Sequence, residues 1–123
     1  MSTADLKTLS VAQLVDRFAV IGVQQDKALI VDDVAVFTPL YWEMDAVDQE
    51  LKGRPGDERR ALVKLFDHPN MQVRLAAAKA TLAVAPKAAR RLIEQIAATT
   101  HYPQAGDAGM CLMNLDRGIF VPR

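Results

Sequence analysis

Three polar side chains near the end of the sequence, Cys111, His101 and Asp107, have the residue types of an activated nucleophile. An imidazole oriented by a carboxylate can deprotonate a thiol, which then becomes the attacking group. Helical spacing disfavours this chemistry, because Cys111 lies beside the apolar stripe of its predicted helix, where a cysteine usually packs as a small hydrophobe. We therefore expect no catalytic residue. The alternative is a small-molecule binder or an enzyme with a pocket near Tyr102, Asp107 and Cys111.

Histidines and acids could also bind a metal ion if their side chains converged. His68 and His101 are the two histidines, they lie far apart in the sequence, and neither belongs to a His-x-x-x-His or Glu-x-x-His pair. Glu43, Asp45 and Asp48 fall within two turns of one predicted helix, and acids at this spacing usually form a solvated face. The sequence therefore predicts neither a metal site nor a cofactor.

A basic cluster offers a third kind of site, one that binds anions. Lys87 and Arg91 are one helical turn apart, with Arg90 beside them and Lys79 one predicted helix earlier. Against nucleic-acid binding, the chain has no net charge, and Glu94 lies close enough to Arg91 to pair with it. We therefore expect no nucleic-acid partner. The alternative is that these four basic residues bind the phosphate backbone of a nucleic acid.

Trp42 is the side chain that bears most directly on binding to another protein. On a helix it points away from Phe37 and the main apolar stripe, toward the side that carries Ala35 and Ala46. One interpretation is that this face packs against the next pair of helices in the same chain. The other is an aromatic anchor for a partner or for a second copy of the chain. Solvent exposure of Trp42 separates the two interpretations.

Acidic and basic residues are unevenly distributed along the chain. Residues 1–57 hold ten acidic and five basic side chains, whereas residues 58–123 hold five acidic and ten basic ones. Such asymmetry can orient a partner or favour head-to-tail contact between two copies. The alternative is that each half simply has a solvated charged face.

Length and composition predict one globular domain over residues 1–123, with a flexible N-terminus over residues 1–8. Half of the 123 residues are apolar, which is enough for one core. No apolar run approaches the ~20 residues that span a bilayer, and the first residues lack the basic and apolar blocks of a signal peptide. A single cysteine, Cys111, cannot form an internal disulfide. We expect a cytoplasmic protein without membrane contact.

Helix signals recur along the sequence, and no segment resembles a strand. Ser10 and Gln13 form a capping box, which predicts a first helix from Val11 to about Leu29. The other predicted helices begin at Val34, after Asp57, at Met71, at Pro86 and after Pro103, and they end before Gly53, at Phe66, at Val84, at Ala97 and before Gly118.

Pro39 complicates the second predicted helix. It lacks the amide proton that an interior helical position needs, so it either kinks a helix that begins at Val34 or starts one capped by Thr38. We favour one kinked helix. Six helices joined by short turns then predict three antiparallel pairs.

The run from Leu65 to Ala80, LFDHPNMQVRLAAAKA, resembles a HEAT repeat: a leucine-rich helix, a turn with Asp and Pro, a Val-Arg pair and an alanine-rich helix. Small side chains let the helices approach closely. Asp67 and Arg74 are placed for a charge-assisted bond across the turn, so we assign both a structural role.

Two further segments, residues 50–57 and 102–109, resemble those of a small bacterial HEAT-like family described as a domain of unknown function. The resemblance implies an all-α fold, a short right-handed α-α superhelix of three HEAT-like pairs, and it carries no known activity. The sequence as a whole therefore predicts a non-enzymatic protein–protein interaction module.

Overall fold

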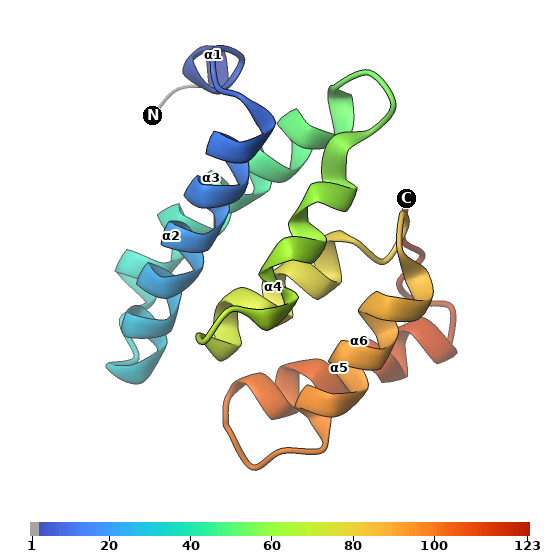
Figure 1. Ribbon diagram of the computed structural model, residues 1–123. Helices are drawn as coiled ribbons and strands as arrows, with labels where there is room; N and C mark the ends of the chain where they lie inside the picture. The colour runs from blue at the N-terminus through green and yellow to red at the C-terminus, as the bar shows by residue number, and fades with distance from the viewer. Residues whose placement is uncertain (1–2) are drawn as a thin grey trace. The chain divides into compact units, whose positions relative to one another are not determined.

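The computed structural model describes residues 3–123, and their side chains from residue 5 onward (Figure 1). These residues are all-helical: they form six α-helices and one 3-10 helix, and this part of the chain contains no strand. In chain order the elements are α1 (Thr3–Leu6), α2 (Val11–Ile30), α3 (Val34–Gly53), η1 (Glu58–Asp67), α4 (Met71–Ala80), α5 (Pro86–Ala97) and α6 (Gln104–Asp116).

Contacts within the chain divide it into two compact units. Unit 1 is Met1–Ala61 and unit 2 is Leu62–Arg123. In unit 1, α2 packs against α3, and in unit 2, α5 packs against both α4 and α6. Among the described helices, none is both long enough and apolar enough to cross a lipid bilayer.

The two long helices of unit 1 begin where the sequence predicted. At the start of α2, the Ser10 amide donates to Gln13 Oε1 at 2.8 Å and the Gln13 amide donates to Ser10 Oγ at 3.1 Å. At the start of α3, the Asp33 carboxylate accepts the Val36 amide at 3.2 Å. The helix then continues through Pro39 to Gly53, which confirms one helix over this segment.

The N-terminal segment, residues 1–8, which the sequence predicted to be flexible, includes a short helix among its described residues. Met1 and Ser2 lie outside the described residues, but residues 3–6 form α1, and Leu6 is buried. The Arg54 guanidinium donates to the carbonyls of Leu6 and Leu9, at 3.2 and 2.8 Å, while its Nε binds Glu50 at 2.7 Å. The guanidinium group of Arg54 thus provides hydrogen bonds to two backbone carbonyls and holds this segment at the end of α3.

The third predicted helix is a 3-10 helix instead of an α-helix. Asp57 adopts a left-handed conformation with φ of 56°, and its carboxylate accepts the backbone amide and the guanidinium of Arg59. The buried residues of η1 are Arg59, Leu62 and Leu65. Their spacing of three matches the three residues per turn of a 3-10 helix.

The alanine-rich helix α4 ends at Ala80, four residues before the predicted end at Val84. The cause is Thr81, whose hydroxyl donates to the carbonyls of Ala77 and Ala78 at 2.9 and 3.1 Å. A threonine hydroxyl that binds the preceding turn competes with continued helix formation. The chain then turns, and α5 begins at Pro86 as predicted.

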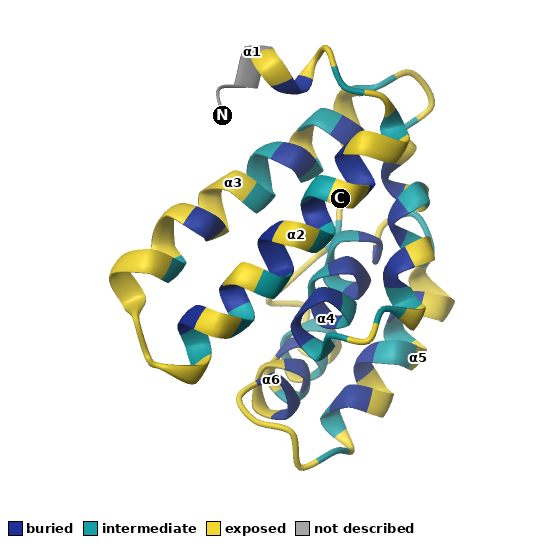
Figure 2. Ribbon diagram, turned by 60° about the vertical axis from the view of Figure 1, so that its left-hand side comes forward, coloured by how far each residue is buried: buried dark blue, intermediate teal, exposed yellow. Residues whose placement is uncertain are grey.

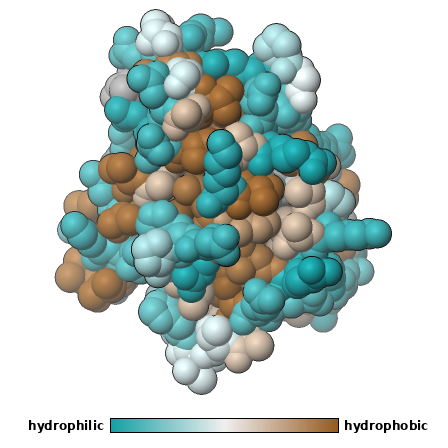
Figure 3. All heavy atoms as spheres, viewed as in Figure 1, coloured by the Kyte–Doolittle hydropathy of each residue, from teal (hydrophilic) through white to brown (hydrophobic). Residues whose placement is uncertain are grey.

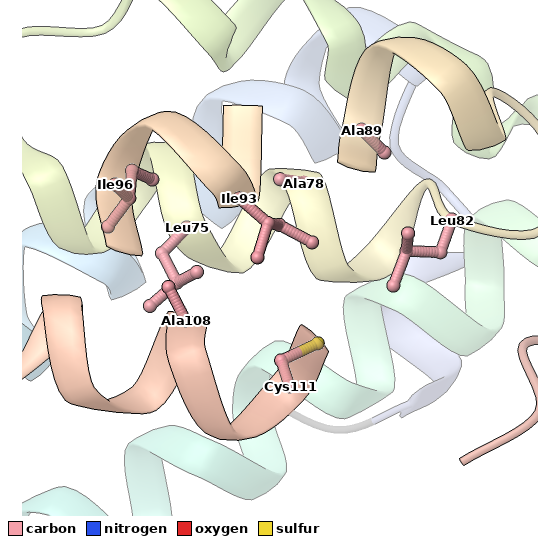
Figure 4. Packing of buried hydrophobic residues seen from close by; sticks show 8 residues of the cluster. All are labelled: Leu75, Ala78, Leu82, Ala89, Ile93, Ile96, Ala108 and Cys111. Carbon is pink, nitrogen blue, oxygen red and sulfur yellow. The ribbon is translucent and has the colours of Figure 1, made fainter. Parts of the chain in front are cut away.

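The core of unit 2 joins its three α-helices. Figure 4 shows side chains of α4, α5 and α6 around Ile93, and Figure 2 shows the dark blue stripes that buried residues form along these helices. The buried cluster consists of Leu75, Ala78, Leu82, Ala89, Ile93, Ile96, Ala108 and Cys111. Several of its members are alanines, and such small side chains let the helix backbones approach closely.

Helix α6 ends as predicted, before Gly118, which has a left-handed φ of 71°. The amides of Ile119 and Phe120 both donate to the Asn114 carbonyl, at 2.9 and 3.1 Å. The backbone therefore folds back onto α6, while both side chains remain exposed.

Candidate partner-binding surface

Trp42 and Tyr41 form an exposed aromatic pair on α3. Their ring centroids are 5.1 Å apart with an interplanar angle of 86°, an edge-to-face contact. Trp42 is 62% exposed and Tyr41 is 50% exposed. Solvent exposure is what an aromatic anchor for a partner requires.

The aromatic pair belongs to a larger exposed surface, which we call the outer face of α3. It consists of Val34, Ala35, Thr38, Pro39, Tyr41 and Trp42, which are all exposed. On the opposite side of the same helix, Leu40 and Val47 are buried. The first half of α3 is thus apolar on both sides, and a helix that is apolar all round is usually covered on both.

Apolar exposure continues to the turn that joins α2 and α3. Ile30 and Val31 are among the most exposed large hydrophobic residues, at 75% and 69%. In Figure 3 brown atoms gather at the lower left, where Figure 1 shows this turn. Contiguous exposed apolar surface of this kind marks interaction sites more often than isolated exposed residues do.

A groove lies between α2 and α3, on a different side of α3 from Trp42. We call it the α2–α3 groove; its volume is about 570 Å³. Its apolar lining is Ala28, Val31, Val36 and Leu40, and its charged lining is Lys27, Asp33 and Glu43. Because the lining combines apolar residues with two acids and one base, the groove suits an apolar segment that carries positive charge.

The predicted nucleophile and pocket residues do not share an environment suited to catalysis. Cys111 is 7% exposed within the core cluster of unit 2, and burial raises the pKa of its thiol. Asp107 binds Lys79 at 2.6 Å, whereas His101 and Tyr102 are exposed. A protonated, buried thiol is a packing residue.

The predicted anion-binding bases are partly neutralised. Lys79 pairs with Asp107, and the Arg90 guanidinium binds both carboxylate oxygens of Asp116, at 2.9 and 3.3 Å. Lys87 and Arg91 are exposed on α5. Two of the four bases therefore already have carboxylate partners, which weakens their attraction for phosphate.

Arg74 binds across the turn, but to a different acceptor from the predicted Asp67. Its Nη1 donates to the His68 carbonyl at 2.7 Å. The turn is closed further by Asn70, whose amide donates to His68 Nδ1 and whose side chain caps α4. Asp67 is exposed. The structural role of Arg74 thus rests on a backbone carbonyl instead of a carboxylate.

Asp48 is an unusual group that sequence reasoning assigned to a solvated face. Burial raises its pKa to about 6, although the positive charge of Arg59 acts in the opposite direction. Its Oδ1 atom is buried and accepts no hydrogen bond within the described part of the chain. The available signal was its position four residues after Met44 and next to buried Val47, at the edge of the apolar stripe.

Within residues 3–123, no group of three or more histidine, cysteine or acidic side chains is placed to hold a metal ion. The acidic residues of α3 have different surroundings: Glu43 lines the α2–α3 groove, whereas Asp48 is largely buried.

These features define a class, an all-helical protein of two compact units with an exposed aromatic surface. The family model for a domain of unknown function, DUF2019, matches residues 12–116, and the chain belongs to that family. It is similar over 96% of its length to the crystal structure of the protein RPA1889 from Rhodopseudomonas palustris CGA009, with 50% identity and a TM-score of 0.93, covering 98% of that chain. No curated protein matches the sequence. The expected resemblance to a family of unknown function is therefore confirmed.

Proposed function

We propose that this protein is a non-enzymatic interaction module that binds a protein partner through the outer face of α3. The observation that carries the proposal is the exposure of Trp42 and Tyr41 beside each other on one helix. Aromatic residues are enriched among the residues that dominate binding energies, and a rigid tryptophan presents a large area at a small entropic cost.

The proposal includes the HEAT-like architecture, in which antiparallel helix pairs stack into a right-handed superhelix. Its support is the turn from Asp67 to Asn70, the alanine-rich α4, and the packing of α2 on α3 and of α5 on α6 across short connections. Solenoids of this kind present extended faces to their partners. The lone buried thiol, Cys111, agrees with a protein that works in the reducing cytoplasm.

Replacing Trp42 with alanine is expected to weaken partner binding by at least ~30-fold, the loss of about 2 kcal/mol typical of an interface anchor. Wild type and Trp42→Ala would be used as baits in lysate of the native host. A protein captured by wild type would then be identified by mass spectrometry, purified and titrated by calorimetry.

Val20→Ala is the matched control, because Val20 is 57% exposed but lies on α2, outside the outer face of α3. Its affinity should equal that of wild type. Equal affinities of Trp42→Ala and wild type for the purified partner would remove Trp42 from the interface and with it the proposed surface.

A further inference from the structure

We infer that a second copy of this chain binds the α2–α3 groove through its segment Arg117–Arg123. The inference rests on an apolar segment with basic ends in unit 2 and an apolar groove with acidic residues at its edge in unit 1. It is independent of the proposed function, because the groove and the outer face of α3 lie on different sides of the helix.

The segment presents three consecutive apolar side chains to solvent. Ile119, Phe120 and Val121 are 69%, 39% and 57% exposed. Arg117 and Arg123 flank them, and no acid lies between. Because two amides of the segment donate to the Asn114 carbonyl, the backbone that carries Ile119 and Phe120 is already ordered. Ordering before binding lowers the entropic cost of docking.

The groove complements the segment in both polarity and charge. Its apolar lining can take the side chains of Ile119 and Phe120, and its acidic lining residues, Asp33 and Glu43, can pair with the basic residues of the segment. Lys27 is the single base in the lining.

The charges of the two units favour this head-to-tail contact over contact between like surfaces. Unit 1 contains eleven acidic and seven basic residues, whereas unit 2 contains four acidic and eight basic ones. Pairing unit 1 with unit 2 of another copy brings opposite charges together, and pairing two copies of unit 1 brings acids together. Charge complementarity therefore favours binding of the basic segment of a second copy to the α2–α3 groove.

The contact is small, so the expected association is weak. Interfaces well below ~1,200 Å² are typical of transient complexes. In sedimentation-velocity runs from ~10 µM to ~1 mM, a range that brackets such affinities, the weight-average mass of wild type should rise above the 13.5 kDa of one chain. Glu43→Arg and Arg123→Glu should each remove this rise, because each places like charges at the contact.

Mixing the two variants provides the decisive test. In the mixture, Arg123 of the Glu43→Arg variant meets the intact Glu43 of the other variant, and the reversed pair is also complementary. Association should therefore return on mixing. Val20→Ala is the control, because Val20 is 57% exposed but lies outside both the α2–α3 groove and the outer face of α3, and it should associate as wild type does.

Two results would overturn the inference. One is a wild-type mass that stays at 13.5 kDa over the whole range, which would leave the groove to a different basic partner. The other is association that persists in both single variants, which would place the contact between copies elsewhere on the surface.

Discussion

Replacing Ile93 with alanine should lower the free energy of unfolding by about 3–4 kcal/mol, the range seen when a large aliphatic side chain is removed from a closed core. Ile93 is completely buried and belongs to the cluster of residues from α4, α5 and α6. Its removal loses transfer free energy and leaves a cavity that three tightly packed helices cannot readily close. Urea denaturation followed by far-UV circular dichroism measures the change.

Ile119→Ala is the matched control, because it deletes the same atoms at a residue that is 69% exposed. Its effect on stability should stay within about 0.5 kcal/mol at protein concentrations where the chain is monomeric. If both substitutions changed stability equally, the assignment of Ile93 to the core of unit 2 would be wrong.

Replacing Asp48 with asparagine should stabilise the protein at alkaline pH. In the folded chain burial raises the pKa of Asp48 from 3.8 to about 6, so between these values the folded state binds more protons than the unfolded state. Stability from this group is therefore fully present below pH 3.8 and is lost as the pH rises through 6. A shift of about two pKa units corresponds to about 3 kcal/mol.

Asparagine cannot ionise, but its amide is still polar and buried, so the expected gain is smaller than that limit. We expect Asp48→Asn to exceed wild type in unfolding free energy by about 1–2 kcal/mol at pH 8, with the gain falling as the pH is lowered and reaching zero at about pH 5. Urea titrations at a series of pH values measure it. Glu43→Gln, an exposed acid on the same helix, should show little effect at any pH. A gain for Asp48→Asn that did not change with pH would contradict the buried carboxylate.

Much of the fold could be predicted because its helix ends are set by local signals. The Ser10 capping box, the Asn70 cap, Pro86 at the first position of α5 and the left-handed Gly118 act within a few residues of where they stand. Each of these signals acts through neighbouring residues, so it does not depend on contacts with distant parts of the chain. The starts of α2, α3, α4 and α5 were accordingly predicted to the residue.

Other features depend on contacts that the sequence pattern does not contain. The contact that links the N-terminal segment to α3 comes from Arg54, which lies far along the chain and binds the carbonyls of Leu6 and Leu9. The acceptor of Arg74 proved to be a carbonyl, and any residue can supply a carbonyl. The 3-10 form of η1 was missed because Leu62 and Leu65 are compatible with either helical period.

The candidate surface was predicted only as one of two alternatives. Helical spacing placed Trp42 opposite the buried stripe, but a pattern within one helix does not reveal whether another element covers that side. The α2–α3 groove was not predicted at all, because it forms between side chains of two helices. Asp48 was misplaced for the same reason, since its desolvation comes from surrounding structure.

The chain carries one tryptophan and one cysteine, and they lie in different units. Trp42 is an exposed fluorophore in unit 1, whereas Cys111 is a thiol within the core of unit 2. A buried thiol reacts with a disulfide reagent only when its surroundings open, so its labelling rate under native conditions reports the local opening of unit 2. The wild-type sequence thus contains a chemical probe for the opening of unit 2 and, on unit 1, an exposed fluorophore whose emission reports when another molecule covers its ring.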